Sequence, residues 1–351
     1  MEELSSRQQM ILNLVVREYV STAAPVGSKG LAEKFRLSVS SATIRNELAR
    51  LEELGFLTHP HTSAGRMPTE AGYRYFVERL MGEAKLPPEE ERMIAHQFHQ
   101  VRQDVEQWVK LAAAVLARTS RSAALITAPQ STRARFKHVQ LISTHGPMVL
   151  LILVFQDGSV KQEMLTLAQT LAQDALDEVS RRLSNAGEKL SAEGVNALRP
   201  TLPAFEAEIA GVVADILQQT EGRTPSPVYR DGLAEVLKQP EFERREESET
   251  LLRVMEEQSN LLEDVLANAL SPNLGGVQVV IGGEGRWREL RDCSLVLSRY
   301  GVPDHAVGAL GVLGPMRMPY NRTISTVRYV ADLMSDLVSD LYSPEEVVER
   351  D

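Results

Sequence analysis

The first eighty residues hold three short amphipathic helix patterns, a strand pattern, a glycine-containing loop and a fourth helix pattern. This order constrains the fold more than any other feature of the chain. Each helix pattern begins at a small polar residue whose side chain can accept a hydrogen bond from a free N–H of the first turn. These expected caps are Ser5 or Ser6, Ser28, Ser40 or Ser41, and Thr69. Ser6 and Gln9 also have the spacing of a capping box.

The third helix pattern divides into an apolar face and a polar face. Ile44, Leu48 and Leu51 recur at i, i+4 and i+7 and predict a buried stripe. Arginine can pair with guanine and asparagine with adenine in a major groove, and a helix N-terminus favours phosphate. The segment therefore predicts a winged helix-turn-helix domain over residues 1–82, with its third helix in the major groove of double-stranded DNA. The expected contacts on this helix are Ser40, Ser41, Thr43, Arg45, Asn46 and Arg50.

The loop after the third helix supplies a second set of expected DNA contacts. Within residues 60–68 these are His61, Thr62, Ser63 and Arg66. Gly65 allows a tight turn, and Arg66 is expected to enter the minor groove or to clamp a phosphate. His61 is equally well explained as a turn residue. His59 and His61 have no cysteine or acidic ligand close by in the sequence, so no metal site is predicted.

The charge of the chain is unevenly distributed. The net charge is −10, but residues 1–82 hold ten lysines and arginines against nine acidic residues, and the remainder holds 28 against 39. A DNA-binding protein needs a local basic surface and not a basic average. The charge therefore permits DNA binding by the N-terminal segment without demonstrating it.

Beyond Pro87-Pro88, strand and helix patterns alternate in blocks. Strands are expected over Ala123–Thr127, Phe136–Ser143, Met148–Phe155, Val160–Leu167, Val277–Gly282, Cys293–Tyr300 and Val307–Leu313. Glu89–Thr119 is expected to be mostly helical, and Leu171–Thr220 to be helical with interruptions near Ser184–Gly187 and Pro200–Pro203. Further helices are expected over Phe242–Ala269 and Ile324–Leu341. Strands on both sides of a helical block predict a multidomain α+β chain. One α+β domain comprises residues 88–165 and 240–345, and a largely helical insertion comprises residues 166–239.

Several classes of protein are disfavoured. The longest apolar run, Met148–Phe155, is too short to cross a membrane, and the acidic N-terminus lacks a secretory signal. A single cysteine, Cys293, forms no intramolecular disulfide and fits a cytoplasmic protein. His96 and His99 lack a Glu-x-x-His arrangement, and the chain has no phosphate loop or nucleophile elbow. No catalytic residue, cofactor or metal is predicted.

Four sequence blocks near the N-terminus are distinctive: Pro25–Lys29, Ser40–Glu47, Leu51–Gly55 and Pro60–Thr69. They resemble the signature blocks of the HrcA family of heat-inducible transcription repressors. Gly311–Tyr320 resembles the family's C-terminal Gly-Pro-x-Arg-Met block, and Pro240–Phe242 resembles its central one. The chain departs from the family at Gly282–Gly285, where members tend to have Asn after Glu.

The resemblance implies a homodimer built from a winged helix, a GAF-like domain and an inserted dimerisation domain. It implies binding to an inverted-repeat operator, the CIRCE element, upstream of chaperone operons. A GroE-type chaperonin is the implied partner: it assists the repressor into its active form, and heat diverts it to unfolded proteins. By the same resemblance Ser28 and Lys29 join the expected DNA contacts. A marginally stable repressor would suit such a switch.

Two other functions remain open on the sequence. In a ligand-sensing regulator, Gly282–Gly285 could line an effector pocket, although such clusters usually mark a turn between a strand and a helix. An effector would then raise the melting temperature by mass action. In an interaction module, the winged helix would contact protein, and DNA affinity that falls with salt would be absent.

Overall fold

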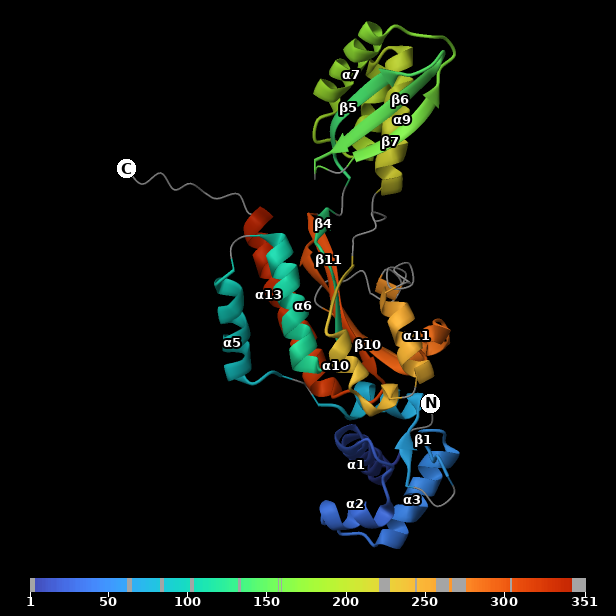
Figure 1. Ribbon diagram of the computed structural model, residues 1–351, viewed down its shortest axis with the longest axis vertical. Coiled ribbons are helices and arrows are strands. Elements are labelled where there is room, and N and C mark those ends of the chain that lie inside the picture. Colours follow the sequence, from blue (N-terminus) through green and yellow to red (C-terminus); the bar gives the residue numbers. More distant parts are fainter. Residues whose placement is uncertain are drawn as a thin grey trace, which may run out of the picture. The chain divides into compact units, whose positions relative to one another are not determined.

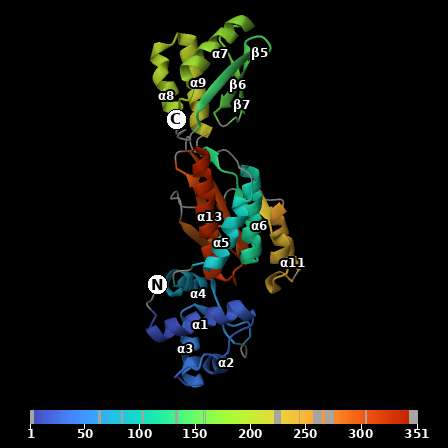
Figure 2. The same ribbon diagram turned by 90° about the vertical axis from the view of Figure 1, so that its left-hand side faces the viewer.

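The computed structural model describes residues 4–61, 65–82, 85–101, 104–131, 134–156, 158, 160–220, 228–243, 245–256, 265–266, 276–303 and 305–342. Figures 1 and 2 show the chain from two directions. It divides into two compact units. The first comprises residues 1–128, 227–301 and 308–351, and the second comprises residues 129–226 and 302–307. No helix in the described ranges is long and apolar enough to span a membrane.

The first unit begins with three helices and a two-stranded antiparallel sheet. Their bounds are α1 Ser6–Thr22, α2 Ser28–Lys34, α3 Ser41–Glu53, β1 Leu57–Thr58 and β2 Met67–Pro68. In β1 and β2, Leu57 pairs with Pro68 and Thr58 with Met67. The end of the expected loop is therefore a strand. A helix follows, α4 Glu70–Tyr75, which continues as the π-helical turn η1 Phe76–Leu80.

Three of these helices have the expected kind of cap, and one does not. Ser40 and Thr69 accept backbone N–H groups at the starts of α3 and α4, as predicted. The capping box of α1 lies one residue earlier than expected and is formed by Ser5 and Gln8. The expected cap at Ser28 is wrong: Ser28 is the first helical residue of α2, and the glycine before it supplies no side-chain bond.

The core of the first unit is an antiparallel sheet with the strand order β8-β3-β11-β10-β9. The short strand β4 pairs with residues 306–307 of β11 away from this path, and both of these segments fall in the residue range of the second unit. The strands are β3 Ala123–Thr127, β4 Gln130–Ser131, β8 Val228–Asp231, β9 Val277–Ile281, β10 Cys293–Val302 and β11 Ala306–Pro315. Successive side chains of β10 point to opposite faces of this sheet. Leu295 and Leu297 join a cluster with Leu251 and Val254 of α11.

Helices cover both faces of this sheet (Figures 1 and 2). On one face lie α6 Val105–Ser120 and α13 Tyr320–Tyr342, with α5 Pro88–His99 outside α6. On the other lie α10 Leu233–Leu237 and α11 Arg245–Glu256. Because both faces are covered, the central strand β11 is buried along almost its whole length.

The second unit packs one face of a three-stranded antiparallel sheet against helices. The sheet has the order β5-β6-β7, with β5 Phe136–Ser143, β6 Met148–Phe155 and β7 Val160–Thr166. The helices are α7 Gln173–Gly187, α8 Ala192–Leu198 and α9 Ala204–Thr220. Val139, Leu151 and Leu153 of the sheet form one buried cluster with residues of all three helices.

This unit begins earlier than the insertion expected from residue 166. The expected α+β domain included β5, β6 and β7, but these strands pair only with one another among the described strands. Their buried side chains contact α7, α8 and α9 and not the six-stranded sheet. Strand patterns alone predict that strands exist, whereas the partner of each strand depends on the apolar faces that meet in three dimensions.

The outer edge of β5 is hydrogen-bonded to side chains of α7. The backbone N–H groups of Val139 and Leu141 donate to Ser184 Oγ at 3.1 Å and Ser180 Oγ at 3.0 Å. The N–H of Ser143 donates to Gln173 Oε1 at 2.8 Å. These bonds satisfy a buried sheet edge that would otherwise cost free energy.

Two expected helices differ from the structure. The final helix begins at Tyr320 and not at Ile324. Leu341 was expected on the buried face of this helix, but its side chain is 42% exposed, and Val338 is buried instead. The helix expected over residues 242–269 begins at Arg245, and part of its expected length lies outside the described residues.

Candidate nucleic-acid interface

Helix α3 is held in place by its apolar stripe. Ile44 and Leu51 are completely buried and Leu48 is 4% exposed, which confirms the predicted stripe. The stripe packs against α1 and α2. Because these contacts fix the rotation of α3 about its axis, they also determine which side chains face solvent.

The opposite side of α3 presents side chains that are available to a ligand. Arg45 and Asn46 are exposed, and neither forms a hydrogen bond or ion pair with any residue that the structure describes. Ser40 caps the helix by accepting the N–H of Thr43 at 3.1 Å, and their hydroxyl oxygens lie 3.0 Å apart. Ser41 is exposed in the first turn. The structure thus brings five of the six expected α3 contacts to one end of the helix.

The sixth expected contact, Arg50, forms an ion pair within the helix. Its Nη1 lies 3.0 Å from Glu53 Oε2, and both side chains are more than half exposed. An exposed ion pair contributes little free energy, so Arg50 can exchange Glu53 for another anion at small cost.

The acidic residues of this segment are neutralised locally. All five acidic side chains between residues 4 and 66 pair with cationic or histidine side chains, and they are Glu18, Glu33, Glu47, Glu52 and Glu53. Arg36 and Arg45 are exposed and form no ion pair with a described residue. The local surface is consequently more attractive to an anion than the nearly neutral count of charges suggests.

Glu52 links α3 to the two chain segments that follow it. Its Oε2 lies 2.7 Å from Arg66 Nη2, and its Oε1 is hydrogen-bonded to Nδ1 of His59. The sequence places no acidic residue close to His59, but the turn at Gly55, with φ of +79°, folds the chain back onto α3. The Arg66 side chain is only 22% exposed. In this structure Arg66 therefore braces the loop against the helix.

The loop backbone also contacts the segment between α1 and α2. The N–H of Val26 donates to Arg66 O at 2.8 Å, and the N–H of Arg66 donates to Val26 O at 2.9 Å. A Cβ atom at Gly65 would lie 2.6 Å from the carbonyl carbon of Val26. Gly65 is thus required by the close approach of two backbones, rather than only by a tight turn.

The remaining expected contacts lie at the edges of this surface. Lys29 is exposed at the start of α2, and its Nζ lies 4.0 Å from Glu33 Oε1. Ser28, the residue before it, is half-buried. His61 is exposed. Thr62 and Ser63 lie outside the described residues.

Arg36 belongs to this surface but was not predicted from the sequence. It lies in the connector between α2 and α3, and its backbone has a φ of +46°. The sequence signal was a basic residue a few positions before the cap of the third helix. The pattern of that connector predicts only a turn, although a cation next to a helix N-terminus can contact the same phosphate as the helix.

The glycine cluster at 282–285 contacts α4. Gly282, Gly283 and Glu284 all have positive φ, so the chain turns sharply after β9. The carboxylate of Glu284 is bonded to the guanidinium of Arg74, whose Nη1 also donates to Val279 O at 2.9 Å. The structure therefore favours a turn that packs against α4 over the effector pocket that the sequence left open.

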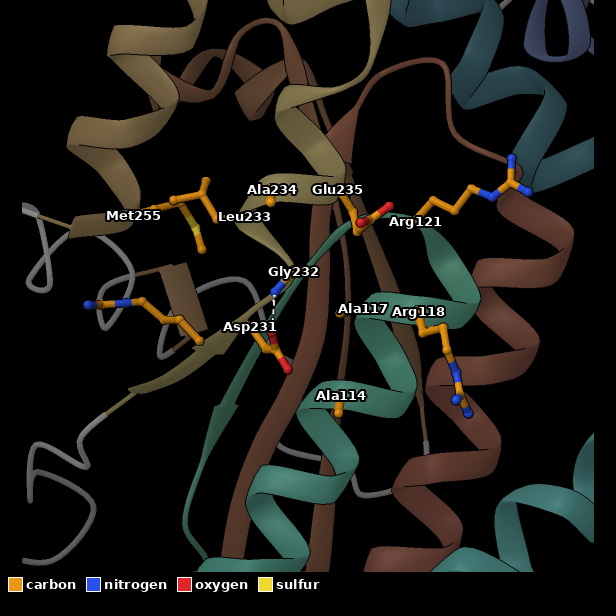
Figure 3. Close-up of a pocket in the computed structure, with 11 residues that line it drawn as sticks. Ala114, Ala117, Arg118, Arg121, Asp231, Gly232, Leu233, Ala234, Glu235 and Met255 are labelled. Atoms are coloured by element: carbon orange, nitrogen blue, oxygen red, sulfur yellow. Dashed lines mark hydrogen bonds between the residues drawn. The ribbon is translucent and has the colours of Figure 1, made fainter.

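A separate pocket of about 860 Å³ lies between α6 and the β8–α10 turn (Figure 3). The N–H of Gly232 donates to Asp231 Oδ1 at 2.6 Å in its wall, and the side chains of Arg118 and Arg121 point away from this turn. Its lining offers no nucleophile beside a base. Among the described residues, no three His, Cys, Asp or Glu side chains gather in a way that could hold a metal ion.

Comparison with known proteins identifies the family. Residues 106–324 match the family model for the HrcA protein C terminal domain. The chain is 46% identical to the heat-inducible transcription repressor HrcA of Herpetosiphon aurantiacus, over 98% of both chains. It is also 46% identical to the repressor of the same name from Chloroflexus aurantiacus, over 97% of this chain and 95% of that one. This chain belongs to the HrcA family.

Membership of HrcA confirms the prediction that the chain is a transcription repressor and not an enzyme. A solved structure, described as that of a hypothetical protein, covers 96% of this HrcA chain with a TM-score of 0.60 and 23% identity. That likeness supports the fold alone. The N-terminal segment lies outside the matched family model, but the full-length relatives include it.

Proposed function

We propose that this HrcA chain represses heat-shock chaperone operons by binding, as a homodimer, an inverted-repeat operator of the CIRCE type. The observation that carries the proposal is the surface of α3, where Arg45 and Asn46 are exposed and unpaired among the described residues, next to a capped helix N-terminus. These groups have the donor and acceptor geometry that base edges in a major groove require.

In this proposal residues 4–82 are a winged helix-turn-helix. Helices α1 and α2 support α3 as the recognition helix, and β1, β2 and the bridge between Val26 and Arg66 form the wing. Ser40, Ser41 and Arg36 lie where they can bind phosphates that flank the bases. The six-stranded sheet with its helices would be the GAF-like domain.

The second unit supplies a candidate dimer interface. Its sheet buries one face against helices. The apolar side chains of the opposite face, here called the apolar sheet face, are Ile142, Met148, Leu150, Ile152, Val154, Val160 and Met164. His138, Gln140, Gln162 and Thr166 lie at its edges on the same side of the sheet. Met164 and Val160 are 49% and 50% exposed. A contiguous apolar surface of this kind is typical of an interface between proteins, and a two-fold dimer would bury it on both copies.

Heat would act on the repressor through its folding. A GroE-type chaperonin assists the cytoplasmic repressor into its active form in this proposal, and unfolded proteins divert the chaperonin during heat shock. The relatives are named as heat-inducible repressors, which supports the link to temperature. A small loss of stability changes the active fraction several-fold, so a folding-dependent switch needs no effector.

A titration of the purified full-length chain tests the proposal. It uses a fluorescent inverted-repeat duplex from a chaperone operon and a scrambled duplex at two salt concentrations, with and without chaperonin. We expect preference for the repeat and a steep loss of affinity with salt, because each phosphate contact contributes a slope of about −0.9. Equal affinity for both duplexes would reject the CIRCE-type operator. If the folded protein binds neither duplex in the presence of chaperonin, the repressor mechanism is wrong.

Replacing Glu52 is expected to change how the wing meets DNA. Glu52→Gln removes the carboxylate that pairs with Arg66 and His59, so the ion pair that draws the Arg66 guanidinium onto α3 is lost. Affinity for the scrambled duplex should rise, and the slope of log K against log salt should steepen by about 0.9 for each subunit whose Arg66 reaches a phosphate. Fluorescence anisotropy over a salt series measures both quantities.

Glu106→Gln is the control of equal charge, because Glu106 pairs with Lys110 at 2.6 Å on the exposed side of α6, outside the expected DNA contacts. If the slope is unchanged in Glu52→Gln while the protein remains folded, Arg66 does not reach DNA even when it is released.

A further inference from the structure

We propose that Arg317 is a positioning residue for DNA recognition: it fixes the orientation of the DNA-binding segment on the six-stranded sheet domain and so sets the operator spacing that the dimer can bind. The DNA-binding segment means residues 4–82. The inference rests on the proposed function, since it concerns how two recognition helices are placed on one inverted repeat.

The Arg317 guanidinium joins three segments that are distant in sequence. Its Nε donates to Glu241 Oε1 at 2.5 Å, and its Nη2 donates to Glu241 Oε2 at 3.2 Å and to Gln239 Oε1 at 3.1 Å. Its Nη1 donates to Val20 O at 2.7 Å. The side chain is only 12% exposed. A bidentate pair with a carboxylate fixes direction as well as distance, which a single contact cannot do.

The contact on Val20 acts at the end of a helix that supports α3. Val20 lies in the last turn of α1, where carbonyl groups lack partners inside the helix. That last turn contains no basic residue of its own, so Arg317 supplies the cation that the helix C-terminus favours. Because α1 packs directly against α3 and β2, a fixed α1 also fixes the recognition helix.

Apolar packing around this contact is incomplete. A cavity of about 420 Å³ beside Arg317 is lined by Tyr19, Met67, Pro68, Tyr73 and Pro240. A second cavity, of about 360 Å³, lies between α1 and the start of α13 and includes Val16, Val20 and Tyr320 in its lining. Where side chains do not interlock closely, discrete polar contacts have a larger share in setting orientation.

A second arginine holds the DNA-binding segment at another point. Arg74 of α4 donates to Val279 O at 2.9 Å and is bonded to Glu284. Without Arg317 the segment would remain attached through Arg74 and through the contact of Tyr73 with Tyr320, whose ring centroids lie 5.9 Å apart. Loss of Arg317 should therefore free the orientation of the segment without unfolding it.

Two blocks of the family resemblance meet at this point. Arg317 belongs to the block that resembles the C-terminal Gly-Pro-x-Arg-Met motif, and Glu241 belongs to the Pro-Glu-Phe block. The ion pair of Arg317 with Glu241 therefore joins the two blocks, and Arg317 in turn binds the end of α1.

The test compares operator duplexes of different spacing. Full-length unaltered protein, Arg317→Ala and Glu241→Gln are titrated by fluorescence anisotropy against the inverted repeat, repeats with the spacer lengthened or shortened by one to five base pairs, and a single half-site. Arg328→Ala is the matched control, because Arg328 is an exposed arginine further along α13 and forms no hydrogen bond or ion pair with the DNA-binding segment among the described residues. Thermal melting of each variant reports its folding.

We expect the unaltered protein and Arg328→Ala to favour one spacing. Arg317→Ala should lose about tenfold in affinity at that spacing, within the usual range of coupling between sites, and should keep its half-site affinity. Its dependence on spacing should flatten, and Glu241→Gln, which keeps the Val20 bond, should show a smaller change in the same direction.

Several results would overturn the inference. One is an unchanged spacing profile in folded Arg317→Ala, and another is an equal loss on the half-site and the repeat, which would indicate a general loss of folded protein. If Arg317→Ala melts too early to assay, Glu241→Gln alone decides by the same two criteria. If the unaltered protein binds neither the repeat nor the half-site, the proposed function fails and this inference fails with it.

Discussion

Asn46→Ala and Arg45→Ala are each expected to abolish most of the preference for the inverted repeat. Each side chain is exposed on α3 and has no partner among the described residues, so its removal leaves the fold intact. A good bidentate contact to a base contributes about 1–3 kcal/mol. In a dimer the substitution occurs twice, so the cost on the repeat is about 2–6 kcal/mol, or about 30-fold and more. Anisotropy titrations on the repeat and on a scrambled duplex measure the difference.

The two substitutions should differ on the scrambled duplex. Asn46→Ala should leave that affinity almost unchanged, whereas Arg45→Ala should lower it somewhat because a cation is lost. Arg92→Ala is the control, since Arg92 is an exposed helical arginine on α5 whose one side-chain hydrogen bond among the described residues is to Pro88 O. Equal losses on both duplexes for Asn46→Ala would show that Asn46 does not contact bases.

Met164→Glu is expected to separate the dimer into monomers. Met164 lies on the edge strand β7 of the apolar sheet face, opposite Leu150 of the central strand, which in turn pairs with Ile142. The side chain is 49% exposed, so a glutamate there is tolerated by the folded monomer. In a two-fold interface the new carboxylate is buried on both copies, and the dimer dissociation constant should rise by at least about a hundredfold. Sedimentation velocity over a concentration series measures this constant.

Operator binding should fall in parallel with dimer formation. Met164→Glu should bind the inverted repeat no better than a single half-site at concentrations where the unaltered protein is dimeric. Glu163→Gln is the matched control, because Glu163 is the exposed neighbour of Met164 on β7 and alternation along the strand directs it to the opposite face. A dimeric Met164→Glu protein would place the interface elsewhere on the chain.

The local elements of the DNA-binding segment could be predicted from the sequence with few errors. Ile44, Leu48 and Leu51 recur with the period of a helix, so burying one of them requires burying all three, and this places Arg45 and Asn46 in solvent. Ser40 and Thr69 cap their helices because the bond they accept spans three residues. Strands β3, β5 and β6 also have the predicted bounds, since alternation is a property of neighbouring residues.

The partners of these elements depended on contacts between distant residues. Periodicity predicts that β5 and β6 form a hairpin but not whether that hairpin joins the larger sheet, and here the helices after it complete its core instead. The Arg66 side chain was expected to reach DNA from the loop, whereas the turn at Gly55 brings it onto Glu52.

The sequence by itself determined the family, the cap of α3 and the side chains that this helix exposes. These properties follow from short-range spacing and from motifs that lie within a few residues of one another. Only the tertiary structure revealed that Glu52 pairs with both His59 and Arg66. It also revealed the hydrogen bond from Arg317 to Val20, two residues that are 297 positions apart in the sequence. Charged side chains appear as ordinary solvated residues in a sequence, because an ion pair depends on distances in space and leaves no periodic pattern.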